Sequence, residues 1–133
     1  MSTPPFTGTW QLQSWTALKN GTPSGYPMGE DAEGQIIYAE DGFMCAFLMR
    51  ADFAAKNGPA AAETCLSYGG KWSFAEGRIA HQVSFSSLPH WIGRKLIRNV
   101  DRKGDLMTLR TEVETSKSGT RYEHVLVWKR AVS

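Results

Sequence analysis

The chain has 133 residues, a length that suits one folded domain with one hydrophobic core. Its 15 basic and 13 acidic residues give a formal net charge of only +2, and this dispersed charge argues against nucleic-acid binding through a basic surface. The N-terminal residues lack the pattern of a secretory signal, and no apolar run is long enough to span a membrane, so we expect a cytoplasmic protein without a membrane partner.

The first predicted strand opens with Gly8-Thr9-Trp10 and alternates two sets of side chains along the following residues. Successive side chains of a strand point to opposite faces, so the alternation gives this segment an inner and an outer surface. We expect the Trp10 indole to cover the closed end of a β-barrel, with its N–H bonded to a carbonyl. Arg130, near the end of the chain, is expected to stack on that ring.

Residues 19–29 are rich in turn formers and predict a long loop over one barrel mouth. Residues 34–39 and 43–50 then predict two strands, joined by a hairpin turn at Asp41-Gly42. Cys45 lies in the second of these strands, and both it and Cys65 are interpreted as reduced, buried thiols. A disulfide between the two cysteines remains an open alternative.

The alternation of side chains stops between Ala51 and Tyr68. Pro59 suits the first turn of a helix and Gly69 suits the position just past its end, which predicts a short helix over residues 59–68. Alternation then resumes and predicts five more strands, over residues 70–75, 78–86, 94–101, 105–112 and 120–130.

Eight strands joined by short turns predict an all-β fold. The expected architecture is an eight-stranded antiparallel up-and-down β-barrel, formed by residues 1–133 as a single domain, with one short helix at its open end. A sandwich of two sheets would give similar strand spacing and remains the structural alternative.

Several motifs resemble those of the lipocalin-like domain family, a set of small stand-alone barrels of bacteria and fungi. The resemblance spans almost the whole chain, and it implies a calyx that holds small, largely apolar molecules. Some lipocalin-like barrels catalyse cofactor-free lyase, isomerase or cyclisation steps, so the resemblance is compatible with either a carrier or an enzyme. The main matching motifs are Gly8-Thr9-Trp10, Tyr26-Pro27-Met28-Gly29, Tyr68-Gly69-Gly70-Lys71-Trp72, Pro89-His90-Trp91-Ile92-Gly93 and Val127-Trp128-Lys129-Arg130.

Two histidines are the candidate catalytic residues. His81 alternates with Ile79, Val83 and Phe85, so we expect one imidazole to enter the cavity from an apolar face. An imidazole there could transfer a proton or anchor a ligand, and the competing interpretation is a hydrogen-bonded core histidine. His124 lies on a similar alternating segment and could supply a second imidazole.

The other candidate residues would bind a ligand. An inward Arg98 or Arg110 would meet a ligand carboxylate or enolate, whereas the more common arrangement places such a residue outward on a polar face. Trp91 is expected to act as an aromatic lid, and tyrosine hydroxyls to contact a polar ligand end. The expected hydroxyl groups and apolar walls are those of Tyr38, Tyr122, Phe43, Phe47, Met49, Phe85 and Leu126.

The leading hypothesis is therefore the binding of a small aromatic or polycyclic hydrophobic molecule, by a monomer or a homodimer. The alternative is a cofactor-independent lyase, dehydratase, isomerase or cyclase of secondary metabolism, with His81 or His124 as general acid or base. A third hypothesis is a partner-binding module that uses Trp91 and residues 51–68 as an exposed patch. Histidine spacings typical of zinc sites are absent from the sequence, so no metal or cofactor is expected.

Overall fold

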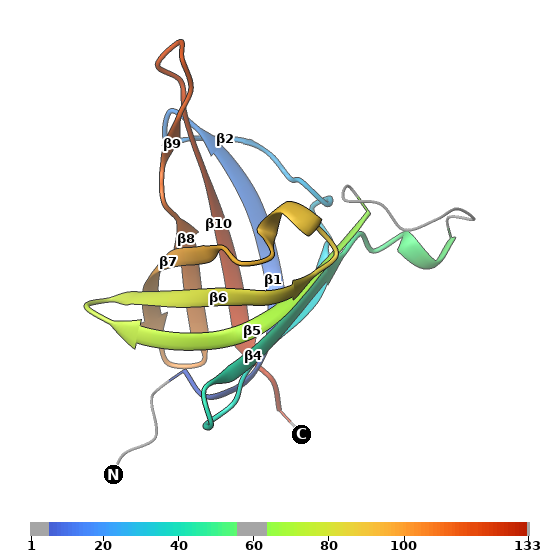
Figure 1. Cartoon of the computed structure of the whole chain (residues 1–133). Coiled ribbons are helices and arrows are strands. Elements are labelled where there is room, and N and C mark those ends of the chain that lie inside the picture. The colour runs from blue at the N-terminus through green and yellow to red at the C-terminus, as the bar shows by residue number, and fades with distance from the viewer. Residues whose placement is uncertain (1–5, 56–63, 133) are drawn as a thin grey trace.

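The computed structural model describes residues 6–55 and 64–132. In the described part of the chain, one antiparallel sheet closes on itself, because β1 pairs with both β3 and β10 (Figure 1). This closure confirms the predicted eight-stranded all-β barrel and excludes the sandwich. The barrel strands are β1 (Gly8–Lys19), β3 (Glu33–Tyr38), β4 (Phe43–Met49), β5 (Cys65–Ala75), β6 (Arg78–Ser86), β7 (Lys95–Lys103), β8 (Leu106–Thr111) and β10 (Arg121–Arg130).

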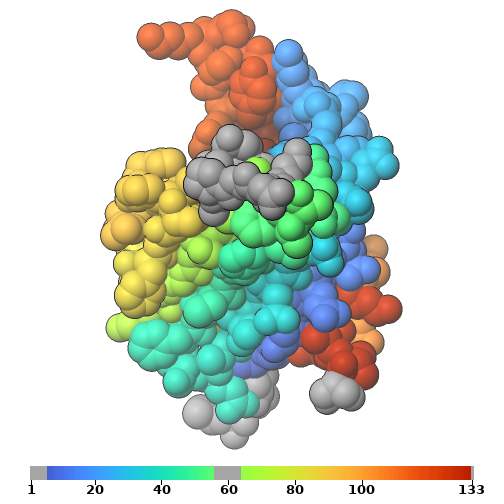
Figure 2. Space-filling model, turned by 90° about the vertical axis from the view of Figure 1, so that its right-hand side faces the viewer, coloured from blue at the N-terminus to red at the C-terminus, as the bar shows by residue number. Residues whose placement is uncertain are grey.

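Two short strands lengthen the barrel at its mouth. β2 (Thr22–Gly25) pairs with β1 inside the segment predicted as a loop, and β9 (Glu114–Thr115) pairs with β10. The connection from β9 to β10 projects beyond the barrel, at the end opposite the C-terminus (Figures 1 and 2). No helix in the described residues is long and apolar enough to cross a membrane.

The predicted helix over residues 59–68 is wrong in its second half. Residues 65–68 belong to β5, where Cys65 pairs with Met49 and Tyr68 with Ala46. Pairing with β4 and burial of the inward side chains outweigh the local helix signal. Residues 59–63 lie outside the described part of the chain. The helical turns that the described residues contain are the 3-10 turns η1 (Phe53–Ala55) and η2 (Pro89–Trp91).

The closed end of the barrel is built around Trp10, as predicted. Its side chain is fully buried, and its indole N–H donates to the Phe6 carbonyl oxygen at 2.9 Å. The Arg130 guanidinium lies 4.3 Å from the ring centroid and that of Arg102 lies 5.3 Å from it. Cationic groups at such distances from an indole are attracted by its π-system.

Two β-bulges change which side chains face the interior. In β1, Gln13 is an extra residue between Leu12 and Ser14 relative to the facing strand β10. In β6, Ser84 is an extra residue opposite Gly69 and Gly70. Position 70 requires glycine, because a Cβ atom there would overlap the backbone of the bulged strand. Each bulge reverses the inward and outward faces of the residues that follow it.

Both cysteines are free thiols, so the open disulfide alternative does not hold. Cys45 is exposed, which contradicts the prediction that its thiol is buried. The reason is strand alternation, because Met44, Ala46 and Leu48 are the buried side chains of β4 and Cys45 lies on its outer face. Cys65 is partly buried.

We expect Trp10→Ala to lower the free energy of unfolding by roughly 3 to 5 kcal/mol, because it removes a large side chain from the closed end. Trp10→Phe is the matched control, since it keeps a ring against Arg130 and loses the hydrogen bond to Phe6 together with a smaller part of the buried ring. Its cost is expected to be about 1 to 3 kcal/mol. Urea unfolding measures both values, and a Trp10→Ala protein with the wild-type midpoint would contradict the assignment.

Candidate functional site

The barrel interior contains a cavity of about 530 Å³. Its walls come mainly from β7, β8 and β10, while η2 and β9 border its mouth. Leucine side chains and indole rings form most of the apolar surface, in agreement with a binding site for an apolar molecule. Apolar wall residues include Trp15, Leu48, Leu66, Leu96, Leu109 and Leu126.

The inward residues of β10 show how the cavity deepens. Tyr122 is 45% exposed at the mouth, His124 and Leu126 are half-buried, and Trp128 is only 2% exposed. All four side chains line the cavity. Trp128 pairs with Leu12 and with Met107 on the neighbouring strands, close to the closed end. It therefore forms part of the cavity floor.

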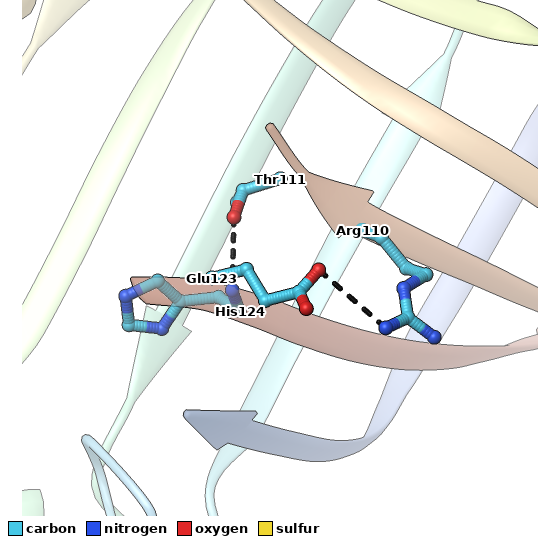
Figure 3. Close-up of polar contacts among 4 residues, drawn as sticks. All are labelled: Arg110, Thr111, Glu123 and His124. Atoms are coloured by element: carbon cyan, nitrogen blue, oxygen red, sulfur yellow. Dashed lines mark hydrogen bonds and ion pairs between the residues drawn. The ribbon is translucent and has the colours of Figure 1, made fainter. Parts of the chain in front are cut away.

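His124 is held in a defined orientation at the cavity wall. Its Nδ1 accepts a hydrogen bond from the Trp15 indole N–H at 3.0 Å, so the proton of the neutral ring lies on Nε2. Its backbone N–H donates to the Thr111 hydroxyl at 2.8 Å (Figure 3). Burial lowers the pKa of His124, the charge of Arg98 acts in the same direction, and Glu114 opposes both. These effects favour the neutral imidazole.

Arg98 and Arg110 have opposite placements. Arg98 lines the cavity, and within the described residues it forms no ion pair with a carboxylate. Arg110 is exposed on the outer face of β8 and pairs with Glu123, with 3.4 Å between Nη2 and Oε2. Figure 3 shows the His124 imidazole pointing away from this pair. The expected inward placement is thus wrong for Arg110, because the inward side chains of β8 are those of Met107 and Leu109.

His81 is fully buried behind the cavity wall and is absent from its lining. Its Nε2 lies 2.7 Å from the Tyr38 hydroxyl and its Nδ1 lies 2.9 Å from the Tyr68 hydroxyl. Burial lowers the pKa of His81 to about 3, and the charge of Arg98 contributes in the same direction. The structure therefore agrees with the hydrogen-bonded core histidine, and Tyr68 separates its ring from the cavity.

The two tyrosines that hold His81 differ in their access to the cavity. Tyr68 lines the cavity, whereas Tyr38 is fully buried and does not. The expected contact of Tyr38 with a ligand is replaced by its bond to His81. Burial raises the pKa of both phenols, and the charge of Arg98 opposes the rise in each. Both hydroxyl groups consequently keep their protons at neutral pH.

The phenylalanines expected as cavity walls lie outside the barrel. Phe43 and Phe47 are exposed on the outer face of β4, which Met49 shares by strand alternation. Phe85 is 72% exposed, because the bulge at Ser84 turns it to the outer face of β6. These four predictions are wrong as placements. Phe47 and Phe85 do meet at a surface hollow of about 570 Å³, but no charged side chain lines that hollow.

Trp91 lies at the cavity mouth, as expected of an aromatic lid. It lines the cavity and packs edge-on against Tyr68, with ring centroids 5.4 Å apart. The exposed partner-binding patch expected over residues 51–68 is contradicted at its C-terminal end, because the Leu66 and Tyr68 side chains are buried. Residues 56–63 of that segment lie outside the described part of the chain.

The structure brings together five of the predicted site residues, namely Trp91, Arg98, Tyr122, His124 and Leu126. Trp15 and Trp128 also line the cavity but are not among the predicted site residues. Trp128 alternates with His124, so its inward placement could have been predicted from that pattern. Trp15 could not, because the bulge at Gln13 reverses the apparent alternation of β1. Within the described residues, no group of three or more His, Cys, Asp or Glu is placed to hold a metal ion.

A closed antiparallel barrel with an apolar inner cavity is the architecture of lipocalin-like proteins. Residues 7–131 match the lipocalin-like domain family, and the chain belongs to this family. The chain is also similar to the 4'-hydroxy-3'-methoxypropiophenone carrier protein ppsC of Aspergillus oryzae, with 38% identity over 53 residues. The match covers 40% of this chain and 48% of that protein, about half of its length. No solved structure matches the chain.

The buried His81 predicts a loss of stability in acid. An unfolded histidine has a pKa of about 6.5, whereas the folded value is about 3. Between these values the unfolded chain binds a proton that the folded chain does not, so stability is present above the unfolded pKa and falls toward the folded one. Urea unfolding from about pH 7.5 to pH 4.5 measures this dependence.

The variant His81→Gln should flatten that pH dependence, since it removes the titrating group and keeps polar atoms between the two tyrosines. His124→Gln is the control, because the less buried His124 contributes a smaller part in the same direction. If the free energy of unfolding changed with pH equally in the wild type and in His81→Gln, the pH dependence could not be assigned to His81.

Proposed function

We propose that this protein binds a small aromatic or polycyclic hydrophobic molecule in its inner cavity. The observation that carries the proposal is a cavity of about 530 Å³ whose buried wall consists mainly of leucines and indoles, while most of its charged side chains are exposed. This volume lies within the roughly 300 to 1,000 Å³ typical of small-molecule sites. Arg98, His124 and Tyr122 supply polar contacts that can orient such a molecule.

The similarity to ppsC supports a carrier role. That protein is named as a carrier of a propiophenone, which is an aromatic ketone by its chemical name. Because the match covers 48% of that protein, the chemical identity of the ligand is not transferred to this chain. The lining residues named above all come from one chain, so the proposal is compatible with a monomer and with a homodimer.

His124 supports a second candidate function, a cofactor-independent lyase, dehydratase, isomerase or cyclase. Its imidazole lines the cavity. The hydrogen bond from Trp15 occupies Nδ1, so the other ring nitrogen, Nε2, is the one that can contact a bound molecule. With Nδ1 occupied, the Nε2–H can donate to a developing enolate oxygen, whose charge Arg98 would also stabilise. His81 would act in such a reaction only through the hydroxyl of Tyr68.

We expect N-phenyl-1-naphthylamine to bind with saturable fluorescence enhancement, because its fused rings fit an apolar cavity. Leu126→Trp should abolish binding, because the larger side chain fills the lumen that Leu126 lines. Val125→Trp is the matched control, since Val125 pairs with the outward Arg110 on the neighbouring strand. Equal probe affinity in both variants would contradict binding inside the barrel.

Native mass spectrometry of freshly purified protein separates the two candidate functions. A carrier should release a bound aromatic molecule that the protein leaves chemically unchanged on incubation. Conversion of that molecule by the wild-type protein, slowed by about two to four powers of ten in His124→Gln, would instead support the enzyme. His124→Gln should bind the molecule with a modest loss in either case.

A further inference from the structure

One partly buried cation lies in the cavity wall. The charged residues of the lining are Arg94, Lys95, Arg98, Glu112 and Glu114, and Arg98 is the one among them that is not exposed. A positive charge that is partly removed from water is unfavourable unless a negative group lies beside it. The charge of Arg98 therefore depends on its immediate neighbours more than the charges at the rim do.

Those neighbours include no compensating anion in the described part of the chain. The Arg98 guanidinium donates through Nη1 to the Ile97 carbonyl oxygen at 3.3 Å, and this acceptor is neutral. Among the described residues, no carboxylate lies within ion-pair distance of Arg98. A guanidinium has five N–H donors, so the hydrogen bond to Ile97 leaves donors for a bound molecule.

The positive charge of Arg98 lies among the polar groups of the interior. Burial is the main cause of the shifted pKa values of Tyr68, His81 and His124, and the charge of Arg98 is the next largest influence on each. Tyr68 and His124 line the cavity together with Arg98. The groups that this charge reaches are neutral phenols and imidazoles, so they do not balance it.

A row of polar side chains crosses the cavity wall from β7 to β10. Arg98 pairs with Thr111 on β8, and the Thr111 hydroxyl accepts a hydrogen bond from the His124 backbone N–H on β10 (Figure 3). All three side chains line the cavity. The Trp15 indole occupies His124 Nδ1, which leaves the Nε2–H of the neutral ring as a donor. The row therefore presents a cation and an N–H donor to the lumen.

We infer that the cavity binds an aromatic carboxylic acid in its ionised form, with the carboxylate on the Arg98 guanidinium and the ring against the leucines and indoles of the wall. The planar guanidinium matches a carboxylate, because two parallel N–H groups can bind its two oxygen atoms. This inference rests on the proposed function and adds to it the chemical class of the ligand and the residue that recognises it.

Two planar probes of similar shape test the inference. 2-Naphthoic acid is ionised at neutral pH, and 2-acetylnaphthalene has a methyl group in place of one carboxylate oxygen. Isothermal titration gives the affinity of each probe for the wild type, for Arg98→Met and for the control Arg110→Met. Arg110 is a matched control because it lies on the neighbouring strand and carries the same charge on the outer face of the barrel.

In Arg98→Met, we expect the affinity for the acid relative to the ketone to fall about tenfold to a hundredfold, which is the range of hydrogen bonds to a charged group. In Arg110→Met that ratio should stay at its wild-type value, because water screens a charge on the outer surface.

A second measurement uses the wild type alone. An apolar cavity without a cation raises the pKa of a bound acid, whereas an adjacent guanidinium lowers it. Nuclear magnetic resonance of bound 2-naphthoic acid, isotope-labelled at its carboxyl carbon, should therefore show the carboxylate form from about pH 7.5 to about pH 5.5. Protonation of the bound acid within that range would contradict the contact with Arg98.

The outcomes separate this inference from the proposed function. An equal ratio of affinities in the wild type and in Arg98→Met, or binding of the ketone without binding of the acid, would overturn the carboxylate inference and leave the hydrophobic cavity intact. Failure of both probes to bind the wild type would overturn the proposed function and the inference with it.

Discussion

The pairing of β1 with β10 determines both ends of this barrel. At the closed end it places Trp10 opposite Arg130, so that the indole is buried beneath a guanidinium. Further along, it places Ala17 opposite His124 and Trp15 opposite Leu126, so that the Trp15 indole reaches the His124 ring. The same pairing closes the sheet, which leaves an inside where apolar side chains can surround a ligand. Without this pair of strands, neither the closed end nor the cavity would form.

The polar side chains of the interior form two groups with different roles, one buried behind the cavity wall and one at the wall. Behind the wall, Tyr38, His81 and Tyr68 satisfy one another in a neutral chain of hydrogen bonds. Such a chain limits the orientations of the Tyr68 hydroxyl, which is its contact with the cavity. At the wall itself, Arg98 and His124 are open to a bound molecule. The chain of hydrogen bonds thus orients the Tyr68 hydroxyl, the group that it shares with the cavity.

Strand positions could be predicted from the sequence because alternation, turn residues and glycines act locally. β6 and the hairpin between β3 and β4 match their expected segments closely, and the Trp10 closure follows from chemistry that the residues themselves carry. The inner aromatic lining could not be predicted in the same way. Bulges at Gln13 and Ser84 depend on how two strands pair, and they turn Trp15 inward and Phe85 outward against the local pattern. On β4 there is no bulge, and the apolar residues of both faces leave the direction of Phe43 and Phe47 undetermined by alternation alone.

The bulge at Ser84 also affects how the sequences of such barrels can diverge in length. Loss of this single amino acid would restore regular pairing and leave Phe85 opposite Gly69 on the outer surface, because Ser84 is the residue without a partner on β5. One codon gained or lost at this position therefore changes the length of β6 without moving a neighbouring side chain between the outer surface and the lumen. Barrels of this kind can in this way vary the length of a strand while the size of the molecule they admit stays the same.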